Sequence, residues 1–223
     1  MKPFKYFIFF LLIIFGISKS HAQMYRFSNT NPFWKGEVKL TDGEIIEGLI
    51  QVPYKSSQRR VAYKIDEDAD RQILKAEDVD AIYLTSSTGY QYLFERVDVY
   101  NTMKQNRSYG KKDLLLVSRK NNHATLYIMH GTIEVNHKED KIDLVYYYHQ
   151  GRDVPMTTYY IRKNNVEHAY LLGTSIKITN FRNRIAFHLN EVPSLVEKVK
   201  NRELRQKHLE EIIDIYFKET ENM

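Results

Sequence analysis

Apolar and polar residues alternate along most of the chain between positions 35 and 172, and apolar residues recur at helical spacing after position 175. Alternation is typical of strands with one buried face, and apolar residues at every third or fourth position are typical of amphipathic helices. The pattern predicts a β-rich body over residues 23–174 and a helical segment over 175–223 that packs on the same domain. Between them we find no linker rich in proline, glycine or serine.

Two alternating segments flank an Asp-Gly dipeptide at positions 42 and 43, which predicts a β-hairpin. A two-residue loop would put Glu47 opposite Val38, on the face that Val38 must bury. A three-residue loop that ends with Gly43 in the left-handed conformation puts Ile46 opposite Val38 instead. We therefore predict the longer loop, whose register also pairs Gly36 with Gly48.

Eight further segments combine alternation with β-branched and aromatic residues, and we expect each to form a strand. They cover residues 60–65, 79–85, 90–97, 113–119, 124–129, 142–149, 157–162 and 167–172. Short strands at such spacing, separated by polar turns, favour an antiparallel arrangement. The fold class that we expect is α+β, a mostly antiparallel β-sandwich or partly open barrel with two to three C-terminal helices.

The helices are predicted from three apolar stripes. Ile178, Phe181, Ile185 and Leu189 share one helical face. Pro193 suits the first turn of a second helix that runs to Val199. Proline has no backbone N–H, and in the first turn of a helix that N–H would have no partner within the helix. A third helix is predicted over residues 202–218. Its stripe consists of Leu209, Ile212, Ile213 and Tyr216.

The first 22 residues have the pattern of a cleavable secretory signal peptide. Lys2 and Lys5 precede an apolar run of about 12 residues, which is short of the about 20 that a membrane-spanning helix needs. Small residues at Ser20 and Ala22 fit a signal peptidase, so we predict cleavage between Ala22 and Gln23. The expected address is outside the inner membrane, in the periplasm, at the cell surface or secreted, with no membrane span in the mature chain.

Removal of this leader changes the charge. It takes away three lysines and no acid, which lowers the net charge from +5 to +2. Lysines and arginines scattered among acids give little of the clustered positive field that a phosphate backbone requires, so we expect no nucleic acid as a partner. The chain has no cysteine, which excludes thiol catalysis and disulfide exchange.

Catalytic and metal-binding motifs were not found. His123, His130 and His137 stand seven residues apart, unlike the close spacing of zinc ligands on one helix. The acidic run from Asp66 to Asp70 lacks the glycine and distal glutamate of a calcium loop, so a solvated turn is favoured. The chain contains neither a nucleophile elbow nor a phosphate-binding loop. We therefore predict no catalytic residue, no cofactor and no metal ligand.

Tyrosine is abundant, with 17 residues and local clusters at 146–148 and 159–160. Because neighbouring residues of a strand face opposite sides of a sheet, each cluster is expected to point at least one ring outward. An exposed tyrosine is a platform for a sugar or a protein. Tyr147 and Tyr160 are the ligand-platform candidates, against the simpler interpretation that they pack within strands.

Three features of the chain, a leader and two segments of the mature protein, carry a resemblance to known proteins. They are the leader that ends at Ala22-Gln23, the hairpin from Gly36 to Ile50, and the Tyr159 to Lys163 strand followed by helices from Phe181 to Pro193. Together they resemble conserved exported proteins of unknown function from Bacteroidota. The hairpin alone is also similar to the hairpin of SH3-like and Sm-like small barrels. The resemblance implies export and carries no activity, cofactor or catalytic residue.

Three functions remain open from the sequence. The favoured one is a non-catalytic interaction module of the periplasm or cell surface, with an envelope protein as its partner. The alternatives are a glycan- or small-ligand-binding protein and a hydrolase whose site is assembled from distant residues.

Overall fold

The computed structural model describes residues 31–101, 112–149, 152–154, 157–175, 178–221 and 223, and the side chains of residue 134 and of residues 143–154 are not described. Asn31–Met223 form one compact unit. The predicted leader and the Ala22-Gln23 cleavage site lie outside the described residues.

The strands are β1 (Phe33–Leu40), β2 (Ile45–Gln51), β3 (Arg60–Lys64), β4 (Gln72–Lys75), β5 (Val79–Thr85), β6 (Gln91–Tyr100), β7 (Lys112–Lys120), β8 (Ala124–Met129), β9 (Thr132–Asn136), β10 (Lys141–His149), β11 (Arg152–Val154), β12 (Thr158–Lys163) and β13 (Ala169–Thr174). The helices are α2 (Phe181–His188), α3 (Pro193–Lys200) and α4 (Leu209–Thr220), with 3₁₀ turns η3 (Ala76–Asp78) and η4 (Gln206–His208).

The β1–β2 hairpin has the predicted register. Val38 pairs with Ile46, and Gly36 pairs with Gly48. The loop has three residues, because the N–H of Leu40 donates to the carbonyl of Glu44 across it. Gly43 has a φ of 93°, the left-handed conformation that this loop requires.

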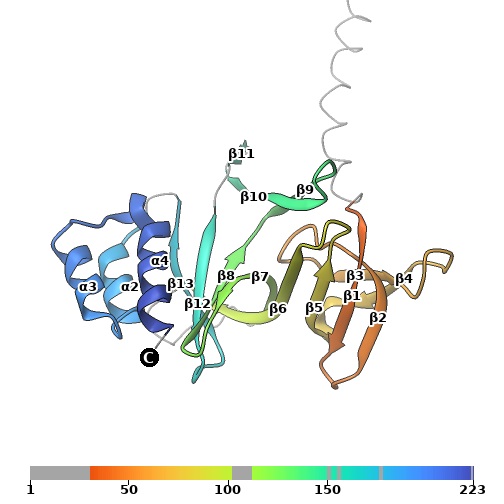
Figure 1. The fold of residues 1–223 in the computed structure, drawn as a ribbon, viewed down its shortest axis with the longest axis horizontal. Coiled ribbons are helices and arrows are strands. Elements are labelled where there is room, and N and C mark those ends of the chain that lie inside the picture. Colours follow the sequence, from red (N-terminus) through yellow and green to blue (C-terminus); the bar gives the residue numbers. More distant parts are fainter. Residues whose placement is uncertain (1–30, 102–111, 150–151, 155–156, 176–177, 222) are drawn as a thin grey trace, which may run out of the picture. The chain divides into compact units, whose positions relative to one another are not determined.

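A large sheet contains ten strands in the order β13-β12-β8-β7-β6-β5-β1-β2-β3-β4 (Figure 1). Neighbours along this order are antiparallel. In addition, β13 pairs in parallel with β6, through Ala169 opposite Val99 and Tyr170 opposite Tyr100. This pairing closes β6, β7, β8, β12 and β13 into a ring, which is a small barrel. A smaller sheet contains β9, β10 and β11.

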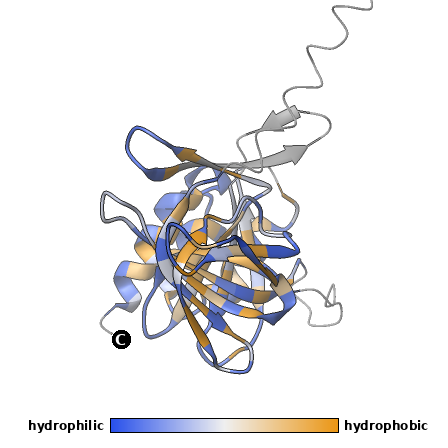
Figure 2. Cartoon of the chain, turned by 90° about the vertical axis from the view of Figure 1, so that its right-hand side faces the viewer, coloured by the Kyte–Doolittle hydropathy of each residue, from blue (hydrophilic) through white to orange (hydrophobic). Residues whose placement is uncertain are grey.

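Three apolar clusters fill this architecture. The first packs against β1–β7 and includes Ile133 of β9, and Ile50, Ile82 and Phe94 are among its fully buried members. The second fills the interior of the barrel and consists of Val97, Val99, Leu115, Tyr127, Tyr160 and Ala169. Adjacent residues of β7 serve both, because Leu114 and Leu116 face the first cluster and Leu115 faces the second. Figure 2 shows the resulting alternation of apolar and polar residues along the strands.

The third cluster joins the helices to the barrel. Leu126, Ile161 and Leu172, on the outside of β8, β12 and β13, pack against apolar stripes of all three helices. These stripes are Phe181 and Ile185 of α2, Leu195 and Val199 of α3, and Leu209, Ile212, Ile213, Tyr216 and Phe217 of α4. At roughly 1.5–3 kcal/mol for each fully buried large side chain, packing outweighs helix propensity in such short helices.

The expected fold class is therefore confirmed: the chain is strand-rich, with a large mostly antiparallel sheet and three C-terminal helices. The predicted start of the third helix is wrong, because α4 begins at Leu209 rather than near residue 202. Arg202 has a φ of 67°, and the N–H groups of Glu203 and Leu204 both donate to the carbonyl of Lys198. This turn ends α3 and buries Leu204. The pattern also missed β4, β9 and β11, which have three to five residues each.

Candidate functional site

One face of the β1–β2–β5 region points away from the core into solvent. Alternation along β1 buries Trp34 and Val38 and exposes Lys35 and Glu37. We call this surface the open face. It is defined by the exposed or half-buried residues Lys35, Glu37, Glu47, Leu49, Tyr83 and Thr85, which pair across the three strands.

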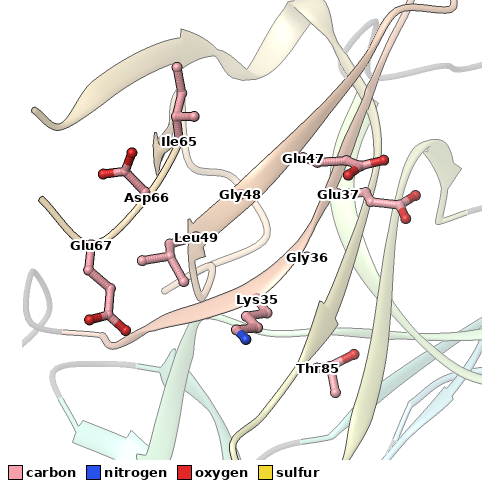
Figure 3. Close-up of a pocket in the computed structure, with 10 residues that line it drawn as sticks. All are labelled: Lys35, Gly36, Glu37, Glu47, Gly48, Leu49, Ile65, Asp66, Glu67 and Thr85. Carbon is pink, nitrogen blue, oxygen red and sulfur yellow. The ribbon is translucent and has the colours of Figure 1, made fainter. Parts of the chain in front are cut away.

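A hollow of about 460 Å³ lies on the open face (Figure 3). The open face supplies one side, and Ile65, Asp66 and Glu67, which follow β3, supply another. The backbones of Gly36 and Gly48 also line it.

The two glycines permit a close approach of neighbouring strands at the hollow. A Cβ atom on Gly36 would lie 2.0 Å from the carbonyl oxygen of Tyr83 in β5. A Cβ atom on Gly48 would lie 2.3 Å from the carbonyl oxygen of Lys64 in β3. Any side chain at either position would push the strands apart, so the hollow depends on both glycines.

The charges that line the hollow are mostly negative. Four acids, Glu37, Glu47, Asp66 and Glu67, accompany a single base, Lys35. The Asp66 carboxylate accepts hydrogen bonds from the N–H groups of Asp68 and Ala69, at 3.0 and 2.7 Å, so it stabilises its own turn. The other three carboxylates have no such role in the turn.

Glu37 and Glu47 stand directly opposite each other in the β1–β2 pair. Figure 3 shows their side chains side by side, projecting from the two strands. Within the described residues, no ion pair involves either carboxylate. Two like charges in this relationship destabilise a sheet, so a cation that arrives between them would be bound favourably.

Exposed apolar side chains surround the acidic row. Tyr83, opposite Glu37 on β5, exposes 46% of its surface, and Ile65 in the hollow exposes 62%. Ile45, at the start of β2, exposes 56%. An aromatic ring and aliphatic side chains beside charged groups form the mixed composition of a protein-binding surface.

The interior of the barrel offers no comparable site. Its six buried residues fill it, and Tyr127 is fully buried there. At one end, Glu95 accepts hydrogen bonds from the hydroxyl of Tyr127 and, at 2.6 Å, from the guanidinium of Arg162, and the ammonium of Lys120 lies 3.5 Å away. Burial and the adjacent Glu95 carboxylate raise the pKa of Tyr127. This cluster ties four strands of the barrel together.

Ser56 and His130 form a pair inside the fold that resembles part of a catalytic triad. The Ser56 hydroxyl lies 3.1 Å from Nδ1 of His130, and the N–H of His130 donates to the same hydroxyl. Both residues are almost completely buried, at 3% and 2% exposure. Burial lowers the pKa of His130 to about 3, so the imidazole is neutral. A nucleophile without access to solvent cannot reach a substrate, so the pair is structural.

A second polar cluster lies between the barrel and the helices. Lys163, at the end of β12, donates to Glu191 at 2.8 Å and to the hydroxyl of Tyr216. Burial lowers the pKa of Lys163, although Glu191 opposes this shift. Since Tyr216 is fully buried, the cluster fixes α4 against the barrel.

The two ligand-platform candidates, Tyr147 and Tyr160, belong to different sheets. Tyr160 lies in the barrel interior with 3% exposure, and its hydroxyl donates to Oδ1 of Asn101 at 2.6 Å. Its neighbour Tyr159 is half-buried against the helical cluster. Tyr147 belongs to β10, and its side chain is outside the described residues.

The described residues contain no group of three or more histidine, aspartate or glutamate side chains that could hold a metal ion. In the same part of the chain, every helix is too short or too polar to cross a membrane.

Sequence reasoning did not select the open face, although one signal for it was available. The predicted hairpin register already places Glu37 opposite Glu47. Tyr83 had no such signal, because its position depends on the pairing of β1 with β5.

Comparison with known proteins gives no match, whether to family models, to curated proteins or to solved structures.

Proposed function

We propose that this protein is a non-catalytic interaction module of the periplasm or cell surface, and that its open face binds a protein partner that presents lysine or arginine side chains. The observation that carries the proposal is the Glu37–Glu47 pair. Two acids that repel each other across a sheet lower its stability, and a basic partner turns the same pair into a source of affinity.

The surroundings of the pair support a protein as the partner. Tyr83 and Leu49 flank the acidic row from β5 and β2, and both leave apolar surface accessible. Protein interfaces combine a central aromatic anchor with charged groups that select the partner. A lysine or arginine side chain suits this arrangement, because its aliphatic stem packs on Tyr83 while its head reaches the carboxylates.

The proposed location in the periplasm or at the cell surface is supported by the predicted signal peptide. Residues 1–22 have the charge pattern and apolar run of a cleavable signal peptide, with cleavage proposed after Ala22. The resemblance to exported proteins of Bacteroidota supports the same address. Peptide mass spectrometry of the protein recovered from the periplasm would give an N-terminal peptide that begins at Gln23, as glutamine or as its cyclised pyroglutamate form.

Site-specific photo-crosslinking in living cells tests the interaction. A benzoylphenylalanine at position 83 should yield one adduct of defined mass, and the charge reversals Glu37→Lys and Glu47→Lys should remove it. The same amino acid at Phe187, which is 57% exposed on α2, serves as the control position. An adduct that survives both charge reversals would refute a basic partner at the open face.

A second function is supported by Tyr83 itself. An exposed aromatic ring beside a carboxylate is the usual platform for a sugar ring, which stacks on the aromatic face while the carboxylate accepts its hydroxyl protons. Binding to a glycan array that is lost in Tyr83→Ala and kept in Tyr90→Ala would favour a glycan ligand. Tyr90 is a matched control, because it exposes 50% of its surface.

A further inference from the structure

The last turn of α3 and the connection that follows it to α4 contain many basic residues. Between Lys198 and His208 the chain has a single acid, Glu203, and five bases. We call these five exposed bases the basic platform: Lys198, Lys200, Arg202, Arg205 and Lys207. In the part of the chain that the structure describes, none of them forms an ion pair. Five bases and one acid give this segment a net charge of +4, so the rest of the mature chain, whose total is +2, is slightly acidic.

The backbone holds the platform in a defined shape. Leu204 is 7% exposed and anchors the middle of the connection in the helical core. The N–H groups of Glu203 and Leu204 donate to the carbonyl of Lys198, at 3.0 and 3.2 Å. Nε of Arg205 donates to the carbonyl of Arg202 at 3.2 Å. Ordering the cations on binding therefore costs less conformational entropy than it would in a free loop.

Local helix electrostatics explain only part of this charge. Lys198 and Lys200 occupy the last turn of α3, where the helix dipole favours cations. Arg205 and Lys207 instead precede the first turn of α4, where the dipole favours anions. Arg202 belongs to neither helix. The dipoles of α3 and α4 therefore do not account for Arg202, Arg205 and Lys207.

We propose that the basic platform binds the surface of an anionic phospholipid bilayer. Such a surface offers opposite charge to exposed bases that form no ion pair within the described residues, and the attraction of several bases to one charged surface adds up, whereas separate exposed ion pairs contribute little. Residues 190–208 contain no tyrosine, tryptophan or phenylalanine on which a nucleobase could stack, so the platform lacks the second element of single-stranded nucleic-acid sites. This membrane contact uses a different surface from the open face and does not depend on the partner proposed there.

Vesicle co-sedimentation tests the proposal, with the protein purified as the cell makes it. The vesicles contain either phosphatidylcholine alone or phosphatidylcholine mixed with phosphatidylglycerol. We expect binding to the mixed vesicles at low salt, and little to the neutral ones or at high salt, because exposed charges are screened. Replacing Lys198, Lys200, Arg202 and Lys207 by glutamine should lower the partition coefficient about 100-fold or more. Arg205 is kept because it bonds the turn.

A control variant replaces four exposed bases elsewhere, Arg59, Arg60, Lys75 and Lys138, and changes the net charge equally. It should bind the mixed vesicles as the parent does, and both variants should keep the parental melting temperature. Equal loss of binding in the two variants would overturn the proposal, because net charge alone would then explain it. Binding that persists in the platform variant would also overturn it, as would tighter binding to single-stranded DNA than to the mixed vesicles at the same salt.

Discussion

Gly36 of β1 stands directly opposite Gly48 of β2, and each glycine admits the backbone of a different neighbouring strand. β5 approaches β1 at Gly36, and β3 approaches β2 at Gly48. The pair therefore fixes how four strands come together around the first apolar cluster. It also lines the hollow on the open face, so fold and candidate site depend on the same two residues.

Replacing Gly36 with alanine should destabilise the protein by about 3 kcal/mol or more, because its Cβ would overlap a backbone oxygen that no rotamer change can move. Urea denaturation followed by circular dichroism measures this loss. Gly43→Ala is the control. Nothing lies within 4 Å of a Cβ there, so only the left-handed conformation costs energy, about 1–2 kcal/mol. Equal losses in the two variants would show that β1 and β5 can separate without penalty.

The hairpin that carries these glycines could be predicted because its determinants are local. A buried face that includes Val38 and Ile46, together with a glycine in the loop, excludes the shorter register. Closure of the barrel had no local determinant, since it pairs Ala169 with Val99, seventy residues earlier. β4 and β11 are too short to show alternation, whereas the five residues of β9 do alternate but adjoin a polar segment that favours a loop.

The candidate site also combines residues that local sequence places and residues that only long-range strand pairing places. Glu37 and Glu47 follow from the hairpin register, whereas Tyr83 joins them only through the pairing of β1 with β5. The environment of Tyr160 could not be predicted from its own strand. Adjacent residues of an isolated strand point to opposite sides, and one side was expected to be solvent. In β12 both sides are covered, one by the barrel interior and the other by the helices.

Stability should fall as the pH drops below about 6.5, because two buried histidines must stay neutral in the folded state. Burial lowers the pKa of His130 to about 3, and burial with nearby Lys163 and Arg184 lowers that of His188 to about 4. The unfolded chain therefore binds more protons than the folded chain between these values and 6.5, and stability is lost as the pH falls through that window. His130 alone should remove on the order of 2–3 kcal/mol between pH 7 and pH 4.

The pH dependence of the urea midpoint measures this effect. His130→Gln should be less stable at pH 7 and should show a shallower loss towards pH 4. The exposed His137, changed to glutamine, should leave both the midpoint and its slope as they are. An unchanged slope in the His130 variant would place the acid sensitivity elsewhere.

Glu95 should be far more important for stability than an acid in an exposed ion pair. Its removal in Glu95→Ala leaves the fully buried Tyr127 hydroxyl and the Arg162 guanidinium without their acceptor, which should cost about 3 kcal/mol. Asp214 pairs with Arg119 between α4 and β7, and both side chains are largely exposed. Asp214→Asn should therefore cost less than about 1 kcal/mol. A thermal melt of both variants decides between these outcomes, and similar shifts would mean that the cluster contributes no more than a surface pair.

Glu47→Gln should raise stability and lower partner binding at the same time. The substitution keeps the size of the side chain and removes the repulsion with Glu37, which should stabilise the hairpin by a few tenths of a kcal/mol, up to about 1 kcal/mol. At the open face the same change removes one of the two charges that we propose for a basic partner, so the photo-crosslinked adduct at position 83 should weaken. Asp80→Asn provides the contrast, because Asp80 already pairs with Lys39 at 3.2 Å and its loss should lower stability slightly while the adduct persists. If Glu47→Gln were more stable and crosslinked as strongly as the parent, the Glu37–Glu47 pair would not contribute to binding a partner at the open face.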